Sequence, residues 1–105
     1  MKYRTPFSEY DVTLKRSTYQ TNKTLAVCMF DETDGSPVAT ITVNIDDLFV
    51  KANAEEAFVD TNNCPGIEQF LIENDIAEPV GIYGMSGYCT YPLYRFNIDK
   101  IPVME

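Results

Sequence analysis

The chain has 105 residues, of which 45% are hydrophobic and 23% charged, and its net charge is −8. This length supports one hydrophobic core, so we expect a single domain over residues 1–105. The composition excludes disordered, collagen-like and coiled-coil proteins. No apolar run reaches the roughly 20 residues that a membrane helix needs, and residues 1–6 lack the apolar stretch of a secretory signal. We therefore expect a cytoplasmic protein.

Several chemistries are excluded by the residues that are missing. The chain has no histidine, which removes Ser-His-Asp and Cys-His catalysis and imidazole metal sites. The three cysteines, Cys28, Cys64 and Cys89, form no Cys-x-x-Cys pair and cannot all pair with one another. We expect free thiols, at least two of them buried, with an intermolecular disulfide as the alternative. No metal and no cofactor is expected.

The negative charge is concentrated in the middle of the chain. Between residues 24 and 94 the only basic residue is Lys51, against twelve acidic residues. A protein of this kind lacks the basic stripe needed to bind a phosphate backbone, so we expect no direct nucleic-acid binding. The charge either keeps the protein dispersed or attracts a protein partner with a basic surface.

The first half of the chain predicts strands. Residues 7–14 alternate, with Tyr10, Val12 and Leu14 on the apolar face, and residues 24–30 form an apolar run typical of a central strand. Asp34-Gly35 is a hairpin signal, and the β-branched, alternating residues 38–45 are expected to form the return strand.

The second half predicts one short helix followed by a strand. Residues 57–59 are expected to form a short strand. Asn62 or Asn63 is expected to cap a helix, with Pro65 in its first turn and an end near Asp75. The helix has an apolar stripe at i, i+3, i+4 and i+7: Ile67, Phe70, Leu71 and Asn74.

The last part of the sequence predicts a turn, a strand and a C-terminal tail. The glycine-rich residues 81–87 lack the endings of phosphate-binding loops and are expected to form a flexible turn. Residues 88–98 are expected to form a final strand, in which Pro92 indicates an edge position or a bulge. The tail from residue 100 is expected to fray. The fold class is therefore α+β: a small antiparallel sheet of about four or five strands, with one helix on one face.

The C-terminal half also resembles a known family. The residues that carry the likeness are residues 57–66, Glu73-Asn74, residues 77–79, Gly81, Gly84, Ser86-Gly87, residues 90–92 and Tyr94. They are similar to a domain family of unknown function that is carried by plasmids, conjugative elements and prophages of gut bacteria. The resemblance implies an accessory protein of a mobile element and supplies no catalytic residues. The size and charge also resemble those of small anti-CRISPR proteins from such elements.

We do not expect an enzyme. Our leading hypothesis is an anti-CRISPR protein that binds a type II RNA-guided DNA nuclease through an acidic surface that mimics nucleic acid. Such nucleases hold nucleic acid in basic channels. The alternative is a protein-binding accessory module of a mobile element, unrelated to CRISPR. The sequence leaves the oligomeric state open. The candidate partner-binding residues are acidic side chains and two tyrosine anchors: Asp31, Glu32, Asp34, Asp46, Asp47, Glu55, Glu56, Tyr83 and Tyr88.

Overall fold

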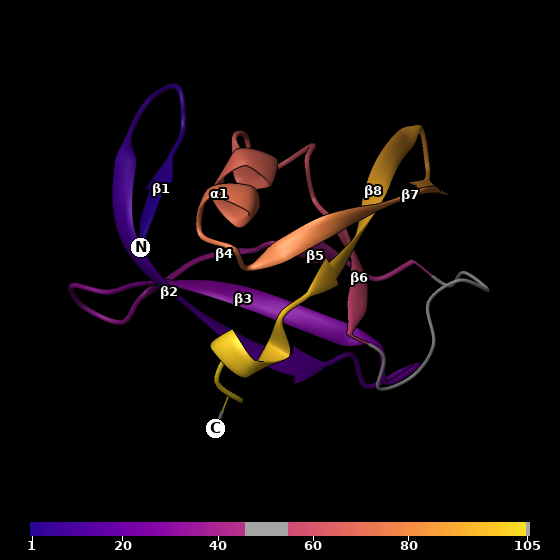
Figure 1. Ribbon diagram of the computed structural model, residues 1–105, viewed down its shortest axis with the longest axis horizontal. Helices are drawn as coiled ribbons and strands as arrows, with labels where there is room; N and C mark the ends of the chain where they lie inside the picture. Colours follow the sequence, from indigo (N-terminus) through magenta and orange to yellow (C-terminus); the bar gives the residue numbers. More distant parts are fainter. Residues whose placement is uncertain (46–54, 105) are drawn as a thin grey trace.

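The computed structural model describes residues 1–45 and 55–104. Over these residues it confirms an α+β fold of antiparallel strands with one short helix, and the strands form two four-stranded sheets (Figure 1). The first sheet has the order β1-β2-β3-β4 and the second the order β5-β6-β8-β7. In chain order the elements are β1 (Lys2–Arg4), β2 (Glu9–Thr18), β3 (Leu25–Asp31), β4 (Pro37–Thr40), β5 (Thr42–Val43), β6 (Glu56–Val59), α1 (Ile67–Glu73), β7 (Ala77–Ser86), β8 (Cys89–Phe96) and a 3-10 turn (Ile98–Lys100).

The first sheet follows the sequence pattern closely. In β2, Val12 and Leu14 are buried and Tyr10 is half-buried, as the alternation predicts. The strand begins at Glu9 because the preceding residues form a turn, in which the Thr5 N–H donates to the Ser8 carbonyl at 2.8 Å. The strand pairs with β3 over seven residues.

The prediction of one continuous return strand over residues 38–45 is wrong, because the chain passes from the first sheet to the second within this range. Residues up to Thr40 pair with β3, whereas Thr42 and Val43 pair with β6 in the second sheet. Ile41 and Thr42 are both buried, which breaks the alternation. The Thr42 hydroxyl oxygen compensates for its burial by accepting the Val27 N–H at 3.2 Å.

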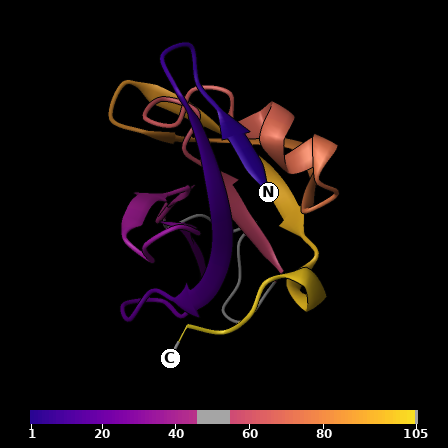
Figure 2. The same ribbon diagram turned by 90° about the vertical axis from the view of Figure 1, so that its left-hand side faces the viewer.

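The helix begins later than the sequence predicts, and the expected asparagine cap is wrong. Helix α1 starts at Ile67, with Gly66 as the capping residue at φ 78° and no side-chain cap. Asn63 is instead held by Asp60, whose carboxylate accepts both its N–H and its side-chain amide at 3.0 Å. Pro65 precedes the helix, and its carbonyl accepts the Tyr3 hydroxyl at 2.8 Å. That bond joins the loop to β1, which runs beside α1 (Figure 2).

The buried stripe of the helix is confirmed for Ile67, Phe70 and Leu71. The fourth position, Asn74, is half-buried and donates its side-chain amide to the Phe70 carbonyl at 2.9 Å. Within the described residues, no helix is long and apolar enough to cross a membrane.

The glycine-rich residues 81–87 are not a flexible turn, which corrects the sequence prediction. Most of them belong to β7, and only Gly87 and Tyr88 form the tight turn to β8. Strand β8 lies inside its sheet, between β6 and β7, so the edge position inferred from Pro92 is also wrong. The bulge alternative agrees better, since the register shifts between Pro79 and Tyr83, next to the partner of Pro92.

Two further expectations are corrected at the C-terminus and at the cysteines. The tail does not fray at residue 100: Ile101 is buried, and the Arg16 side chain donates to its carbonyl at 2.7 Å. The three thiols are free, as expected, but only Cys64 is buried, whereas Cys28 and Cys89 are half-buried.

The hydrophobic core lies between the sheets and under the helix, and a smaller apolar cluster occupies the other face of the second sheet. This smaller cluster is formed by Phe58, Tyr91 and Leu93. The Phe58 ring packs directly on Gly84 of β7, so closely that a Cβ built at Gly84 would lie 2.7 Å from two ring carbons. Because Phe58 is only 1% exposed, its ring has little room to move away.

We expect the Gly84→Ala substitution to lower the free energy of unfolding by about 1–3 kcal/mol, the usual cost of overpacking a core. Urea unfolding followed by circular dichroism measures this change. The control is Met85→Ala on the adjacent, exposed side chain, which we expect to change stability by at most about 0.5 kcal/mol. Equal stability of Gly84→Ala and the wild type would contradict the close packing of Phe58 on β7.

We also expect stability to fall in alkaline solution. Burial raises the pKa of the Tyr3 phenol to about 12, whereas an unfolded tyrosine titrates near 10. The folded state therefore holds the proton more tightly. The resulting stability is complete below a pH of about 10 and is lost as the pH rises towards 12.

The substitution Tyr3→Phe tests this pH dependence. We expect the variant to be about 1 kcal/mol less stable at neutral pH, because it loses the bond to Pro65, and to lose less stability than the wild type between pH 10 and 12. Urea unfolding at several pH values gives both numbers. Any loss of stability that remains in the variant between pH 10 and 12 comes from other groups such as Cys64, because burial raises the pKa of that thiol to about 11. Parallel pH profiles for both proteins would rule out the Tyr3 contribution.

Candidate functional site

The acidic residues of the β3–β4 hairpin largely support the turn itself. Asp31 is half-buried, and its carboxylate accepts the Thr33 N–H at 2.8 Å. The Asp34 carboxylate accepts the N–H and the hydroxyl of Ser36 at 2.9 and 2.6 Å, and these bonds lower the pKa of Asp34. Glu32 is exposed, so it is the hairpin carboxylate most available to a partner.

The remaining acidic candidates do not join this hairpin. Glu55 is exposed just before β6, and Glu56 is half-buried at the start of that strand. In Figure 1 the β3–β4 hairpin lies at the left end of the molecule, whereas β6 begins to the right of its centre. Asp46 and Asp47 lie outside the described residues. The described acidic candidates therefore belong to two groups in separate segments of the fold, the β3–β4 hairpin and the start of β6.

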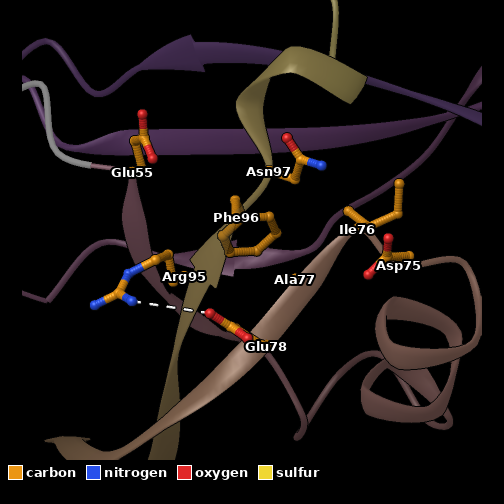
Figure 3. Close-up of a pocket in the computed structure, with 8 residues that line it drawn as sticks. All are labelled: Glu55, Asp75, Ile76, Ala77, Glu78, Arg95, Phe96 and Asn97. Carbon is orange, nitrogen blue, oxygen red and sulfur yellow. Dashed lines mark ion pairs between the residues drawn. The ribbon is translucent and has the colours of Figure 1, made fainter.

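A cleft of about 280 Å³ opens beside the second group, where β7 and β8 approach the 3-10 turn (Figure 3). Arg95 of β8 stands directly opposite Glu56 of β6 and Glu78 of β7 in the register. Its guanidinium lies 3.5 Å from the Glu56 carboxylate and 3.8 Å from that of Glu78. The residues that line the cleft are Glu55, Asp75, Ile76, Ala77, Glu78, Arg95, Phe96 and Asn97.

The cleft is acidic and open to solvent. Asp75 forms an ion pair with Lys100 at 3.1 Å, and Arg95 is shared between two glutamates, so part of the negative charge is neutralised locally. The side chains of Arg95 and Glu78 are 56% and 72% exposed, which keeps these pairs weak. Over the described part of the chain, no group of three or more acidic or cysteine side chains is placed to hold a metal ion. Three of the residues that line the cleft are acidic, and Arg95 is the one basic residue among them, so the lining favours a cationic side chain.

The two tyrosine anchors, in contrast, lie on one hairpin. Tyr83 of β7 is 66% exposed, and Tyr88 in the β7–β8 turn is 105% exposed, a fully accessible side chain. Met85 lies two residues after Tyr83, on the same face of the strand, and is 68% exposed. We call Tyr83, Met85 and Tyr88 the hairpin patch. The turn between β7 and β8, which contains Tyr88, lies at the right-hand end of the second sheet in Figure 1.

Sequence reasoning missed Met85 and the cleft residues Asp75, Glu78 and Arg95. The signal for Met85 was present: Ile82 and Gly84 alternate with Tyr83 and Met85, which is the pattern of a strand. The glycines obscured that alternation. No comparable signal marks the cleft, because it depends on which strands become neighbours.

The comparisons with known proteins give one family. Searches of curated proteins and of solved structures returned no match. Residues 13–104 match a family described as a domain of unknown function, DUF4313. The match covers most of the chain and includes β3 to β8, and thus both the cleft and the hairpin patch. The chain belongs to the DUF4313 family.

Proposed function

We propose that this chain is a protein-binding domain that anchors its partner through the hairpin patch. The observation that carries the proposal is the exposure of three large apolar side chains, Tyr83, Met85 and Tyr88, on one two-stranded hairpin. Tyrosine and methionine are enriched at protein interfaces, where a few such side chains provide most of the binding energy. The proposal assigns no catalytic residue.

The contrast with the other exposed apolar side chains supports this choice. Among the described residues, Phe7, Ile72 and Val103 are also more than half exposed, but each comes from a different element: the β1–β2 loop, the helix and the C-terminal segment. Single exposed apolar residues are normal on a protein surface, whereas a group of them indicates an interaction site.

The charge of the chain indicates the kind of partner. With a net charge of −8, the domain attracts basic surfaces over distances of about 10 Å at moderate salt. Glu32 in the β3–β4 hairpin, and Glu55 and Glu78 beside the cleft, provide exposed carboxylates. We therefore propose a partner with a basic surface and an apolar site for the tyrosines.

The specific partner we propose is a type II RNA-guided DNA nuclease. This part of the proposal rests on the sequence resemblance to mobile-element proteins and to small acidic anti-CRISPR proteins. Such nucleases offer the basic channels that an acidic domain would occupy. The second candidate is a binding module of a plasmid or conjugative element, unrelated to CRISPR, and it uses the same hairpin patch.

We expect the double substitution Tyr83→Ser and Tyr88→Ser to weaken partner binding at least about 30-fold, the effect of losing an interface hot spot. Binding is measured by titration with the partner recovered from the host. The matched control is Phe7→Ser, which removes an aromatic ring that is 94% exposed in a different hairpin and is expected to leave affinity unchanged. Equal affinity of the double variant and the control would place the interface elsewhere.

The nuclease assignment is tested by plasmid cleavage. We expect excess protein to block cleavage by a guide-loaded type II nuclease, and we expect this inhibition to weaken as salt screens the attraction. Glu32→Lys and Glu55→Lys reverse exposed charges in the two separate acidic groups. If one group contacts the nuclease, its reversal reduces inhibition more than the other reversal does, whereas equal effects indicate that only the net charge contributes. Unimpaired cleavage would contradict the nuclease assignment and leave the generic binding module.

A further inference from the structure

Strand β7 has an outer edge that pairs with no other described strand, and the role proposed for the side chains of the hairpin patch does not involve this edge. Strand β7 is the last strand of its sheet, and its ten residues make it the longest outer strand in the described part of the chain. An outer strand offers unpaired main-chain N–H and C=O groups to any extended chain beside it. Proteins normally protect such edges with charge, proline, bulges or short strands.

The other outer strands of the described sheets are protected in these ways. Strand β1 has three residues, two of which are charged; β4 has four residues and begins with Pro37; and β5 has two residues. The first half of β7 is also protected, because Pro79 lacks an N–H, Gly81 has a φ of 92° and the register shifts there. Residues 82–86, in contrast, contain neither a charge nor a proline.

The register identifies which backbone groups face outward in this open stretch. In an antiparallel pair, hydrogen-bonded and non-hydrogen-bonded residue pairs alternate. Pro92 has no N–H to exchange, so its pair with Tyr83 is the non-hydrogen-bonded kind. The next such pair is Met85 with Thr90, while Gly84 bonds to β8 through its pair with Tyr91. The N–H and C=O groups of Tyr83 and Met85 therefore point away from the sheet.

The same two residues carry the exposed side chains of the hairpin patch. A chain that lies beside β7 would bond to the backbone of Tyr83 and Met85 and contact their side chains on one face. Alternate residues of that chain would then be apolar. Its charge is indicated by Glu78, whose side chain is 72% exposed farther along β7, and by the net charge of −8. Two copies of this chain repel each other by the same charge, which disfavours self-pairing.

We infer that residues 82–86 of β7 bind an extended segment of a partner protein as an added strand, and that this segment alternates apolar and basic side chains. The inference rests on the proposed protein-binding function and specifies its mode. The main-chain bonds provide affinity that depends little on sequence, and the hairpin patch and the negative charge select the partner.

The test uses amide hydrogen exchange with a synthetic ten-residue peptide of alternating valine and lysine. In the free protein, the Tyr83 and Met85 amides are expected to exchange fast and the Gly84 amide slowly. Peptide binding is expected to slow exchange at Tyr83 and Met85 at least tenfold and to leave Gly84 unchanged. A peptide methylated on alternate backbone nitrogens is the matched control, because it keeps the side chains and cannot donate the ladder bonds.

Variants of the protein provide an independent arm. Met85→Pro removes one outward N–H, whereas Met85→Ala keeps it and removes only the side chain. We expect the proline variant to lose peptide binding at least tenfold more than the alanine variant. If circular dichroism shows that the proline variant is unfolded, the hydrogen-exchange experiment with the two peptides decides the test without it.

Three outcomes would overturn the inference. The first is no binding of the valine-lysine peptide at millimolar concentration. The second is peptide binding without protection of the Tyr83 and Met85 amides. The third is protection of these amides in the free protein that grows with protein concentration, because a second copy would then occupy the edge. None of these outcomes tests the proposed function, which fails only if the Tyr83→Ser and Tyr88→Ser variant keeps its affinity for the partner.

Discussion

The backbone of Ile41 joins the two sheets, and the rest of the fold depends on this crossing. Its N–H donates to the Val27 carbonyl in the first sheet at 3.0 Å, and its carbonyl accepts the Asp60 N–H, next to the second sheet, at 2.8 Å. Its side chain is fully buried. Buried backbone groups must be hydrogen-bonded, so the chain can leave one sheet here only because the other supplies the partner. Thr42 completes the crossing through its hydroxyl, which bonds to Val27 and Tyr19.

After this crossing the chain forms the second sheet, and the β7–β8 hairpin of that sheet carries the surface that we propose for binding. Phe58 of β6 fixes β7 by packing on Gly84, which leaves the neighbouring Tyr83 and Met85 on the opposite face of the strand. Their side chains are exposed. A rigid strand that presents exposed side chains binds with little loss of conformational entropy, because its backbone is already ordered.

Charge plays a different part from the hairpin patch. Several acidic side chains have local structural partners: Asp34 holds the β3–β4 turn, Glu68 accepts the hydroxyl of the buried Tyr94 at 2.7 Å, and Glu56 and Glu78 share Arg95. These side chains therefore have structural roles as well as their charge. What they share is a long-range field that favours basic partners, while the apolar contacts determine where a partner binds.

The sequence by itself determined the local features: the inward face of β2, the short strand at residues 57–59, the buried stripe of Ile67, Phe70 and Leu71, and the antiparallel α+β class. These features follow from the alternation and spacing of side chains along a few neighbouring residues. The tertiary structure alone decided the change of sheet at Ile41, the strand formed by the glycine-rich residues and the inside position of β8. It also decided the separation of the acidic groups and the cleft around Arg95. The physical reason is that each of these depends on contacts between residues far apart in the chain, such as Phe58 with Gly84, and a local pattern contains no information about which distant strand will pack beside it.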